Sequence, residues 1–445
     1  MYDFVVVGAG ISGLNAIRLL KEKYPKKKIC LIEKTNRLGG LIDTRYINLN
    51  KKDRKIFTKK TKKKNNKTKK KYKSKKKIKY EAGGTVVYEY QKNMIDLIKK
   101  YNIDVLLMPK NKKCLSGAHS KEFWDGKKRK TPLGKKYTKK YFSLLKKLFA
   151  YMDKKKEVYC RKLTLEQIAL EILSFEDVRF IEFCYGYAAE FRVANAVVAR
   201  KNMVNELCNS KYIYLFKNGY NTLVQSLYND IKDYVEVKKN CELKKFENIK
   251  NCVKISLSNE ILKTKKLILA IPREELIKLC SSFSDKELEL LNCVEPYSLT
   301  RIFAKYDMKK KQNDWMKKLK FSTIDNPIRQ IIPLSKSHGL FQISYSDWYF
   351  ADYWGGLSLK STRIVLKKLL SEVFQYEKID EPSKIIKHYW KNACHFWKPN
   401  VNENKKYKEI MHIRNNIHII GESFSLNQGW GEGAIKTSID LIKDI

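Results

Sequence analysis

The hydrophobic positions at the start of the chain form two short apolar runs with a stretch of helical spacing between them. Residues 2–7 form an apolar, β-branched run, which is typical of a buried parallel strand. Residues 11–24 place apolar side chains at helical spacing, and residues 28–32 form a second apolar run. The order of strand, turn, helix and strand predicts a βαβ unit.

The pattern changes twice after this unit. Residues 92–205 have mostly helical spacing, which predicts a helical cap. Strand-like runs return at residues 235–237, 253–257 and 267–271, and Pro272 ends the last of them. We expect these three strands to belong together.

Further strand-like runs predict a second sheet. They are residues 299–306, 328–333 and 340–345. A helix is expected over residues 359–374. The chain then ends in the style in which it began, with a strand at residues 417–420 and a helix at residues 433–442.

Composition narrows the class of protein. A chain of 445 residues suits two or three packed units, and a hydrophobic content of 43% excludes a wholly disordered protein. No stretch approaches the roughly 18 apolar residues of a membrane-spanning helix, so we predict no membrane span. The ten cysteines include no Cys-x-x-Cys pair, which excludes a zinc knuckle and a dense disulfide scaffold. This pattern predicts an intracellular, reducing compartment, with the cytoplasm as the simplest case.

The net charge of +46 is unevenly distributed, with one segment much more basic than the rest. Residues 51–79 contain 17 lysines and Arg54 against Asp53 alone, which is +17 of the total. With few apolar residues to bury, this segment is predicted to be a disordered basic insertion on the surface. It could bind polyanions such as nucleic acid without sequence preference. Alternatively, the lysine bias of the whole chain explains its charge without any function.

A glycine-rich turn follows the first strand. Residues 8–13 read G-A-G-I-S-G directly between a strand and a helix, and Glu33 closes the next strand. Gly8 permits the tight turn, Gly10 lets the backbone approach a pyrophosphate at the positive helix end, and Gly13 allows close packing of helix and strand. Glu33 can accept hydrogen bonds from ribose hydroxyls. The context therefore predicts dinucleotide binding.

Three segments identify the chain with a known family. Residues 33–45 read E-K-T-N-R-L-G-G-L-I-D-T-R, residues 218–227 read N-G-Y-N-T-L-V-Q-S-L, and residues 417–438 contain the strand ending G-E and the helix start W-G-E-G-A. Together they resemble the flavin-containing amine oxidase superfamily, which includes monoamine and polyamine oxidases, protoporphyrinogen oxidase and carotenoid desaturases. Leu41 stands where the family usually has an arginine, and Arg37 and Arg45 remain as cationic candidates.

The resemblance implies noncovalently bound FAD. In the family, the glutamate corresponding to Glu422 holds the ribityl chain, and the backbone corresponding to Val237 flanks the adenine. Independently of the family, the positive end of the terminal helix can stabilise the negative charge of a reduced flavin. The full set of expected cofactor residues is Gly8, Gly10, Ser12, Gly13, Glu33, Lys34, Arg37, Gly39, Gly40, Gly84, Thr85, Val237, Gly421, Glu422, Gly429, Trp430, Glu432 and Ala434.

Three residues are candidates for contact with substrate. Trp430 falls at a family position for a cage aromatic, and His395 or Phe396 falls near the opposing one; for His395, a hydrogen-bonded, partly buried histidine is an equal alternative. An aromatic cage desolvates an amine and lowers its pKa toward the neutral form. Arg301 aligns with a family lysine beside the flavin, but an arginine in a surface ion pair explains it as well. Cys394 is interpreted as an ordinary buried thiol, and no metal-ligand cluster is expected.

The sequence therefore predicts an α/β fold in which a Rossmann-type FAD-binding domain is interleaved with a mixed-sheet and helical substrate domain. We assign residues 1–90, 206–275 and 400–445 to the first, and residues 91–205 and 276–399 to the second. The expected reaction is hydride transfer from an activated C–H bond of a small molecule, such as an amine, to flavin N5, with dioxygen as acceptor. The alternatives are protoporphyrinogen-oxidase-like or desaturase-like dehydrogenation, or a flavoprotein with a polyanion-binding arm and little catalysis.

Overall fold

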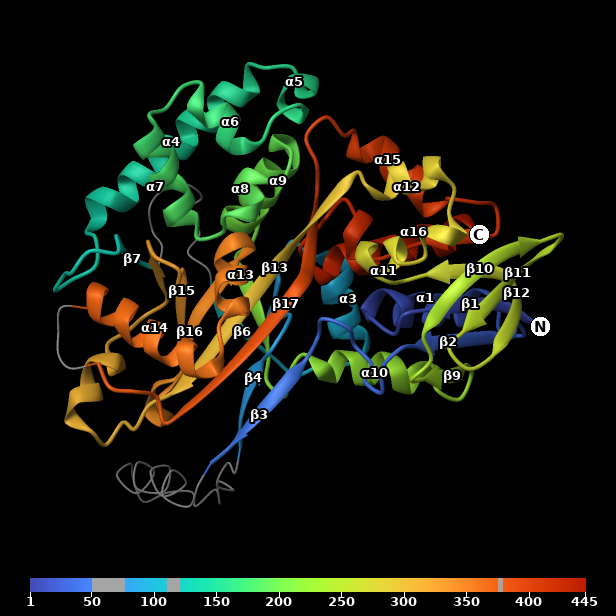
Figure 1. Ribbon diagram of the computed structural model, residues 1–445, viewed down its shortest axis with the longest axis horizontal. Helices are drawn as coiled ribbons and strands as arrows, with labels where there is room; N and C mark the ends of the chain where they lie inside the picture. Colours follow the sequence, from blue (N-terminus) through green and yellow to red (C-terminus); the bar gives the residue numbers. More distant parts are fainter. Residues whose placement is uncertain (50–76, 110–120, 375–378) are drawn as a thin grey trace.

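A seven-stranded sheet organises the part of the molecule that contains both termini (Figure 1). The computed structural model describes residues 1–49, 77–109, 121–374 and 379–445. The strand order is β10-β11-β12-β1-β2-β9, and β18 pairs with β12. These strands are β1 (Tyr2–Val7), β2 (Ile29–Glu33), β9 (Glu236–Lys239), β10 (Leu243–Ile249), β11 (Cys252–Leu257), β12 (Ile261–Leu269) and β18 (Ile417–Ile419). Segments far apart in sequence therefore share one sheet.

The central strands of this sheet are parallel. Strand β1 lies between β2 and β12, with Val6 opposite Leu31 on one side and Ile268 on the other. All three residues are fully buried, as expected for strands covered on both faces. The helices α1 (Ile11–Lys23) and α16 (Gly431–Asp444) pack against each other, and Asn15 Nδ2 donates to Ser438 Oγ at 2.8 Å. The first and last segments of the chain thus form one unit.

A second, six-stranded sheet forms the other unit, in the order β17-β13-β16-β15-β14-β7. Its strands are β7 (Glu122–Trp124), β13 (Val294–Lys305), β14 (Ser322–Ile324), β15 (Gln330–Ser335), β16 (Leu340–Asp347) and β17 (Lys384–Trp397). The long strands β13 and β17 run antiparallel and connect the two halves of Figure 1. The predicted fold class, a Rossmann-type unit interleaved with a mixed-sheet and helical unit, is confirmed.

Helices complete both units. The cap lies at the end of the molecule away from the termini and comprises α4 (Lys135–Asp153), α5 (Glu157–Arg161), α6 (Leu165–Leu170), α7 (Phe175–Tyr185), α8 (Ala189–Arg192) and α9 (Ala196–Leu207) (Figure 1). The remaining helices are α3 (Lys92–Lys100), α10 (Asn221–Ile231), α11 (Arg273–Ile277), α12 (Asp285–Leu291), α13 (Trp348–Gly356), α14 (Leu359–Val373) and α15 (Glu403–Met411). Short 3₁₀ turns are η1 (Cys280–Ser282), η2 (Lys311–Lys317), η3 (Lys336–His338) and η4 (Glu422–Phe424).

The mostly helical stretch at residues 92–205 also contains two strands that the sequence did not predict, β6 (Val105–Pro109) and β7. Strand β6 pairs with β8 (Tyr212–Phe216), which also pairs with β5 (Val86–Tyr88). The apolar run of β6 is only five residues long, which is too short to show whether its spacing is that of a strand or a helix. It forms a strand because it pairs with β8.

The boundary of the basic insertion also changes. Strand β3 (Thr44–Asn48) pairs antiparallel with β4 (Lys77–Glu81), and the register ends with Asn48 opposite Lys77. The prediction of a disordered insertion is therefore wrong for residues 77–79, which are part of a strand. Residues 50–76 lie outside the described residues.

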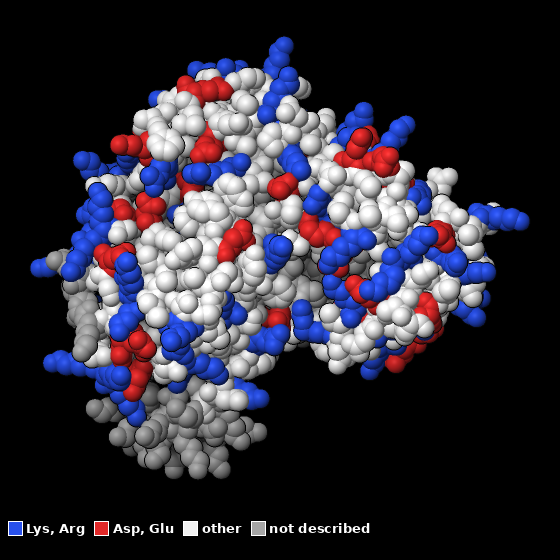
Figure 2. All heavy atoms as spheres, in the orientation of Figure 1, with Lys and Arg blue, Asp and Glu red and all other residues white. Residues whose placement is uncertain are grey.

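Lysine and arginine side chains elsewhere are spread over the visible face of the molecule, with fewer acidic side chains scattered among them (Figure 2). This distribution agrees with solvated lysines on helical faces and not with a single basic patch on that face. No helix among the described residues is long and apolar enough to cross a membrane. Eight cysteines in the described ranges are free thiols, whereas Cys208 is disulfide-bonded. The cellular compartment therefore stays a prediction.

Candidate functional site

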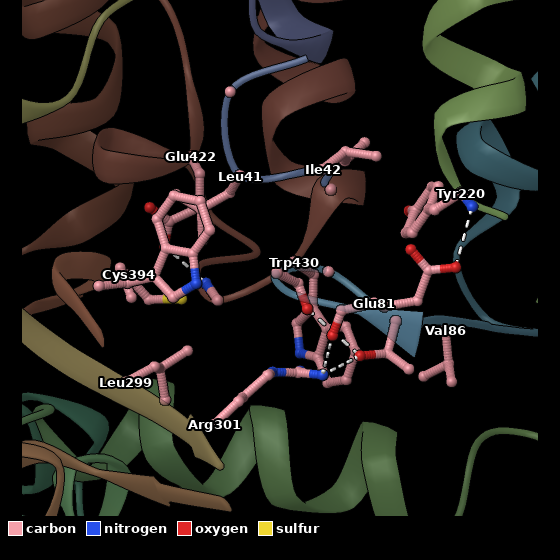
Figure 3. A pocket seen from close by; sticks show the side chains of 18 of the residues that line it. Leu41, Ile42, Glu81, Val86, Tyr220, Leu299, Arg301, Cys394, Glu422 and Trp430 are labelled. Carbon is pink, nitrogen blue, oxygen red and sulfur yellow. Dashed lines mark hydrogen bonds between the residues drawn. The ribbon is translucent and has the colours of Figure 1, made fainter. Parts of the chain in front are cut away.

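A cavity of about 2350 Å³ is lined by residues of both sheets and of the helical cap (Figure 3). Most of the expected cofactor residues line it: Gly8, Gly10, Ser12, Glu33, Lys34, Arg37, Gly39, Gly40, Gly84, Thr85, Gly421, Glu422, Gly429, Trp430 and Ala434. The three candidates for substrate contact, Arg301, His395 and Trp430, line the same cavity. The fold therefore brings together segments from the beginning, middle and end of the chain.

The glycine turn has the geometry that its sequence predicts. Gly8 has a φ of +104°, and a Cβ there would lie 2.4 Å from the carbonyl oxygen of Ala270. A Cβ on Gly13 would lie 2.0 Å from the carbonyl oxygen of Gly8, so α1 can approach β1 only with glycine at this position. A Cβ on Gly10 would meet no atom within 4 Å, so the turn leaves open space on the cavity side.

The N-terminus of α1 fits a pyrophosphate. Its N-cap, Gly10, provides no side-chain cap, and no acidic residue lies in the first turn. The hydroxyl of Ser12 is buried and has no hydrogen-bond partner. A phosphate needs hydrogen-bond donors, which the free N–H groups and the unpartnered hydroxyl supply. The positive end of the helix also attracts its negative charge.

The side chains after β2 are held by the protein itself. Glu33 accepts hydrogen bonds from the backbone N–H groups of Ala9 (3.0 Å) and Thr35 (2.9 Å). Arg37 donates to the carbonyl oxygens of Gly40 and Ile42, and Lys34 pairs with Glu275 at 2.9 Å. These contacts fix the loop that ends at Ile42 against the cavity.

Three expected cofactor residues do not line the cavity. Gly13 is used in helix–strand packing, and Val237 lies on β9 opposite Leu31. Glu432 turns away and accepts hydrogen bonds from the backbone N–H of Met94 at 3.0 Å and from Asn93 Nδ2 at 2.7 Å. Its carboxylate therefore caps the N-terminus of α3.

Arg301 is buried, which excludes the surface ion pair considered above. Its guanidinium lies over the ring of Tyr345, 4.4 Å from the centroid, and donates to Thr85 Oγ1 and to the carbonyl oxygen of Glu81. Figure 3 shows these contacts at the edge of the pocket, where Trp430 also lies. Arg301 thus fixes the segment containing Thr85 beside the cavity.

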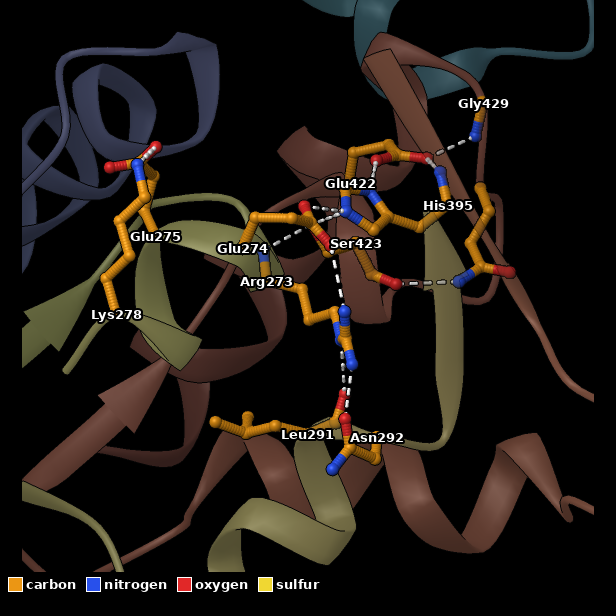
Figure 4. Close-up of polar contacts among 11 residues, drawn as sticks. Arg273, Glu274, Glu275, Lys278, Leu291, Asn292, His395, Glu422, Ser423 and Gly429 are labelled. Atoms are coloured by element: carbon orange, nitrogen blue, oxygen red, sulfur yellow. Dashed lines mark hydrogen bonds and ion pairs between the residues drawn. The ribbon is translucent and has the colours of Figure 1, made fainter. Parts of the chain in front are cut away.

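The other two candidates have different environments. Trp430 precedes α16 and contacts the ring of Tyr88 edge-on, with centroids 5.1 Å apart. His395 is not an open cage wall, because both ring nitrogens face carboxylates: Nδ1 lies 3.0 Å from Glu422 and Nε2 lies 2.8 Å from Glu274 (Figure 4). Its alternative interpretation, a hydrogen-bonded buried histidine, describes this geometry. Cys394, next to it, lines the cavity, and burial raises the pKa of its thiol.

The sequence interpretation missed an acidic pair in the helical cap. Glu190 on α8 and Glu206 on α9 both line the cavity, and the hydroxyl of Tyr185 lies within hydrogen-bond distance of both carboxyl groups, 3.1 Å from that of Glu206. Burial and the neighbouring charge of Glu206 raise the pKa of Glu190 to about 8. Tyr88, which touches Trp430, also contacts Glu206 through its hydroxyl at 3.4 Å. A signal was present, because Glu190 lies in the otherwise apolar run A-A-E-F at residues 188–191.

The cavity around this pair is rich in aromatic side chains. Tyr187 contacts Tyr185 and Tyr345 edge-on, at centroid distances of 5.6 and 5.7 Å. Among the described residues, no group of three His, Cys, Asp or Glu side chains could hold a metal ion. The chemistry available here is therefore a pair of carboxylates in an aromatic wall, connected by Tyr88 to Trp430.

Comparisons with known proteins agree with this architecture. A family model for an NAD(P)-binding Rossmann-like domain matches residues 6–56. A solved structure of a putrescine oxidase double mutant, from a redesign of cofactor binding, superposes with a TM-score of 0.73 at 13% identity and covers 100% of this chain and 98% of that chain. An uncharacterised protein of Acanthamoeba polyphaga mimivirus is 24% identical over 205 residues, which are 41% of this chain and 40% of that protein. The chain thus matches less than half of the length of this curated relative.

Proposed function

We propose that this chain, which has the fold of the flavin-containing amine oxidases, binds FAD noncovalently and oxidises a cationic amine. The observation that carries the choice of substrate is the Glu190–Glu206 pair in the cavity wall. Support for the cofactor comes from the free N-terminus of α1 and the unpartnered hydroxyl of Ser12. When bound, FAD supplies a hydride acceptor at flavin N5, and dioxygen is the proposed electron acceptor.

The acidic pair discriminates among the substrates considered above. Burial and the neighbouring Glu206 raise the pKa of Glu190 to about 8, so a cation that binds beside the pair would favour its ionised form, and the site suits an ammonium group. A polyene has no cation to offer, and the carboxylates of a porphyrinogen would be repelled. The amine class is therefore favoured over desaturase-like and protoporphyrinogen-oxidase-like dehydrogenation.

Different residues of the cavity wall are proposed to bind different parts of the substrate. Glu190 and Glu206 hold the cationic group, with Tyr185 fixing both carboxylates. Trp430 and Tyr88 form an apolar wall that excludes water from the reacting carbon. A guanidinium group does not serve as a base in proteins, so Arg301 instead orients Thr85.

The proposed domain division follows the same logic. Residues 1–90, 206–275 and 400–445 supply the glycine turn, Glu33 and the N-terminus of α16, whereas residues 91–205 and 276–399 supply Glu190, Arg301 and His395. Glu206 stands at the border between the two.

Anaerobic bleaching of the flavin tests the proposal. The purified protein is mixed with diamines, monoamines, porphyrinogens and polyenes, and flavin absorbance is followed before and after air is admitted. We expect reduction by cationic amines alone and reoxidation by dioxygen. Glu206→Gln should raise the amine KM about tenfold without lowering FAD content, because one charged hydrogen-bond acceptor is lost.

A matched control is Glu171→Gln, which changes an exposed carboxylate of the cap that pairs with Tyr151 and Tyr159. Its KM should equal that of the wild type. Bleaching by porphyrinogens or polyenes instead of amines would refute the substrate class. A protein that takes up no FAD would refute the whole proposal, and flavin that stays in the acid-precipitated pellet would refute noncovalent binding.

A further inference from the structure

His395 lies between two carboxylates from separate elements (Figure 4). It is on β17, Glu274 is on α11 directly after β12, and Glu422 begins η4 directly after β18. The Nε2 atom lies 2.8 Å from a Glu274 oxygen, and the Nδ1 atom lies 3.0 Å from a Glu422 oxygen. The histidine side chain is 2% exposed, so water does not replace either contact.

Two carboxylate oxygens at hydrogen-bond distance from the two ring nitrogens suit a ring that carries a proton on each nitrogen. An ionised carboxylate only accepts hydrogen bonds, and a neutral imidazole has a single N–H. Both contacts therefore form together only in the imidazolium state. Burial by itself lowers the pKa of His395, but the bonds to Glu274 and Glu422 outweigh it and raise the pKa to about 9.

The other groups around the ring do not remove this proton. Arg273 Nη1 lies 3.2 Å from Glu274, so two cations and two carboxylates balance when His395 is protonated. Strand β13 places Pro296 opposite His395. Cys394 and Tyr297 are buried with raised pKa values and are neutral. Ser423 Oγ lies 3.5 Å from Nε2.

Glu422 transmits the position of His395 to the end of the chain. One of its oxygens accepts the backbone N–H groups of His395 (3.1 Å) and Gly429 (2.7 Å). Gly429 precedes Trp430 and the N-terminus of α16, and all three lie at the cavity. His395, Glu422 and the turn at Gly429 therefore form one continuous chain of contacts that reaches the cavity wall.

We infer that His395 is a positioning residue of the proposed flavin site, whose imidazolium proton holds Glu422 and, through it, the Gly429–Trp430 turn in the conformation that receives FAD. This inference rests on the proposed function. Loss of the proton leaves one ring nitrogen without hydrogen and two carboxylates without a cation between them. Their repulsion then moves Glu422 and loosens the turn.

FAD binding by the full-length apoprotein tests the inference. Quenching of flavin fluorescence gives the dissociation constant at pH 7 to 10. We expect affinity to fall about tenfold as pH passes 9 in the wild type, since a charged hydrogen bond is lost. Glu274→Gln should move this midpoint down by about one pH unit, because one of the two anions beside His395 is removed. His395→Gln should bind weakly at every pH.

The matched control is His412→Gln, which alters a partly exposed histidine that pairs with Asp444 at 3.2 Å. Its binding curve should follow the wild type. The ionisation of the flavin itself is common to all variants and cancels in the comparison. ¹⁵N NMR of the histidines gives a readout without FAD, and it should place the wild-type titration of His395 near pH 9 and that of Glu274→Gln lower.

A wild-type affinity that is constant through pH 9, or a Glu274→Gln curve identical to the wild type, would overturn the positioning role. So would an NMR titration of His395 near pH 6.5. If His395→Gln does not fold, Glu274→Gln and the NMR titration still decide. A wild-type protein that binds no FAD at any pH would instead refute the proposed function, and the positioning role would fall with it.

Discussion

Trp430 and Glu422 face the same cavity but have different partners. Trp430 offers an aromatic surface packed on Tyr88, whereas Glu422 accepts hydrogen bonds from His395 and Gly429. Under the proposed function, the first contact shapes the space for a substrate, and the second holds the backbone of the cofactor site. Two substitutions at neighbouring positions of the wall should therefore have separable effects.

Trp430→Ala should slow flavin reduction by the amine at least tenfold while FAD content falls little, because it removes an apolar wall and no buried hydrogen bond. Glu422→Ala should instead lower FAD content, because it leaves the N–H of Gly429 without its acceptor. Stopped-flow reduction and the ratio of flavin to protein absorbance measure both quantities. Equal loss of flavin in the two variants would contradict this division.

The raised pKa of Glu190 predicts a pH dependence of stability. A carboxyl whose pKa rises from 4.5 to about 8 on folding contributes stability that is fully present below pH 4.5 and is lost as pH rises through 8. The loss amounts to at most about 1.4 kcal/mol per pH unit in this window. Glu190→Gln removes this loss, so its stability relative to the wild type should increase from pH 6 to pH 8.

Urea unfolding of both proteins at pH 6, 7 and 8 measures the difference. The comparison between the two cancels His395, whose stabilising protonation is lost over a similar window as pH rises from about 6.5 through 9. Parallel stability curves for wild type and Glu190→Gln would show that Glu190 is ionised in the folded protein at pH 6.

The glycine turn could be placed from sequence because the contacts that join Gly8 to Gly13 and Glu33 to Ala9 are local, although Gly8 also packs on the distant Ala270. Gly8, Gly13 and Glu33 lie within one βαβ unit, and spacing alone determines how they meet. Glu274 could not be placed, because its partner is far away in the chain, whereas Glu190 and Glu206 were missed although Tyr185 lies only 5 and 21 residues from them. The contact between His395 and Glu274, for example, joins positions 121 residues apart.

Element α1 shows how one glycine motif combines two requirements. A Cβ on Gly13 would clash with the backbone of the turn. A Cβ on Gly10 would contact no atom on the cavity side, and Gly10 has an ordinary φ of −71°. The first position is constrained by packing of helix on strand. The second is constrained only if a ligand occupies the space next to it.

Gly13→Ala should therefore lower both the melting temperature and FAD content, with destabilisation of about 1–3 kcal/mol from overpacking. Gly10→Ala should keep the wild-type melting temperature in the apoprotein and lose FAD affinity, because its methyl group enters the pyrophosphate space. Differential scanning fluorimetry of apoprotein and FAD titration separate the two effects. Unchanged FAD affinity in Gly10→Ala would place the phosphates elsewhere.

Most elements could be predicted where a period extended over many residues. Strand β1, helix α1 and helix α14 agree with their predicted ranges within one residue at each end. Strands β6 and β10 were missed. Strand β10 reads L-K-K-F-E-N-I, and its polar residues alternate too irregularly to predict a strand without its antiparallel partner β11.

The molecule as a whole is built from interleaved segments. As a result, the β3–β4 hairpin borders the cavity. Strands β3 and β4 are held together through five residue pairs, from Thr44 opposite Glu81 to Asn48 opposite Lys77. Tyr46, Lys77 and Lys79 of this hairpin line the cavity. The two points at which residues 50–76 leave and rejoin the described structure are therefore adjacent, whatever lies between them.

Replacing residues 51–76 by a short Gly-Ser linker should consequently leave FAD content and the melting temperature unchanged, since the pairing of β3 with β4 already fixes both ends. The segment carries 15 lysines and Arg54 against Asp53, so its removal lowers the net charge from +46 to +31. Retention on a DNA column should weaken and become less dependent on salt, because fewer counterions are released from phosphates.

A variant that keeps the segment but lacks basic side chains, with every lysine and Arg54 changed to serine, is the matched control and should behave like the linker variant. Unchanged DNA retention would place polyanion binding on the rest of the surface, and loss of flavin in the linker variant alone would show that the segment itself supports the cavity.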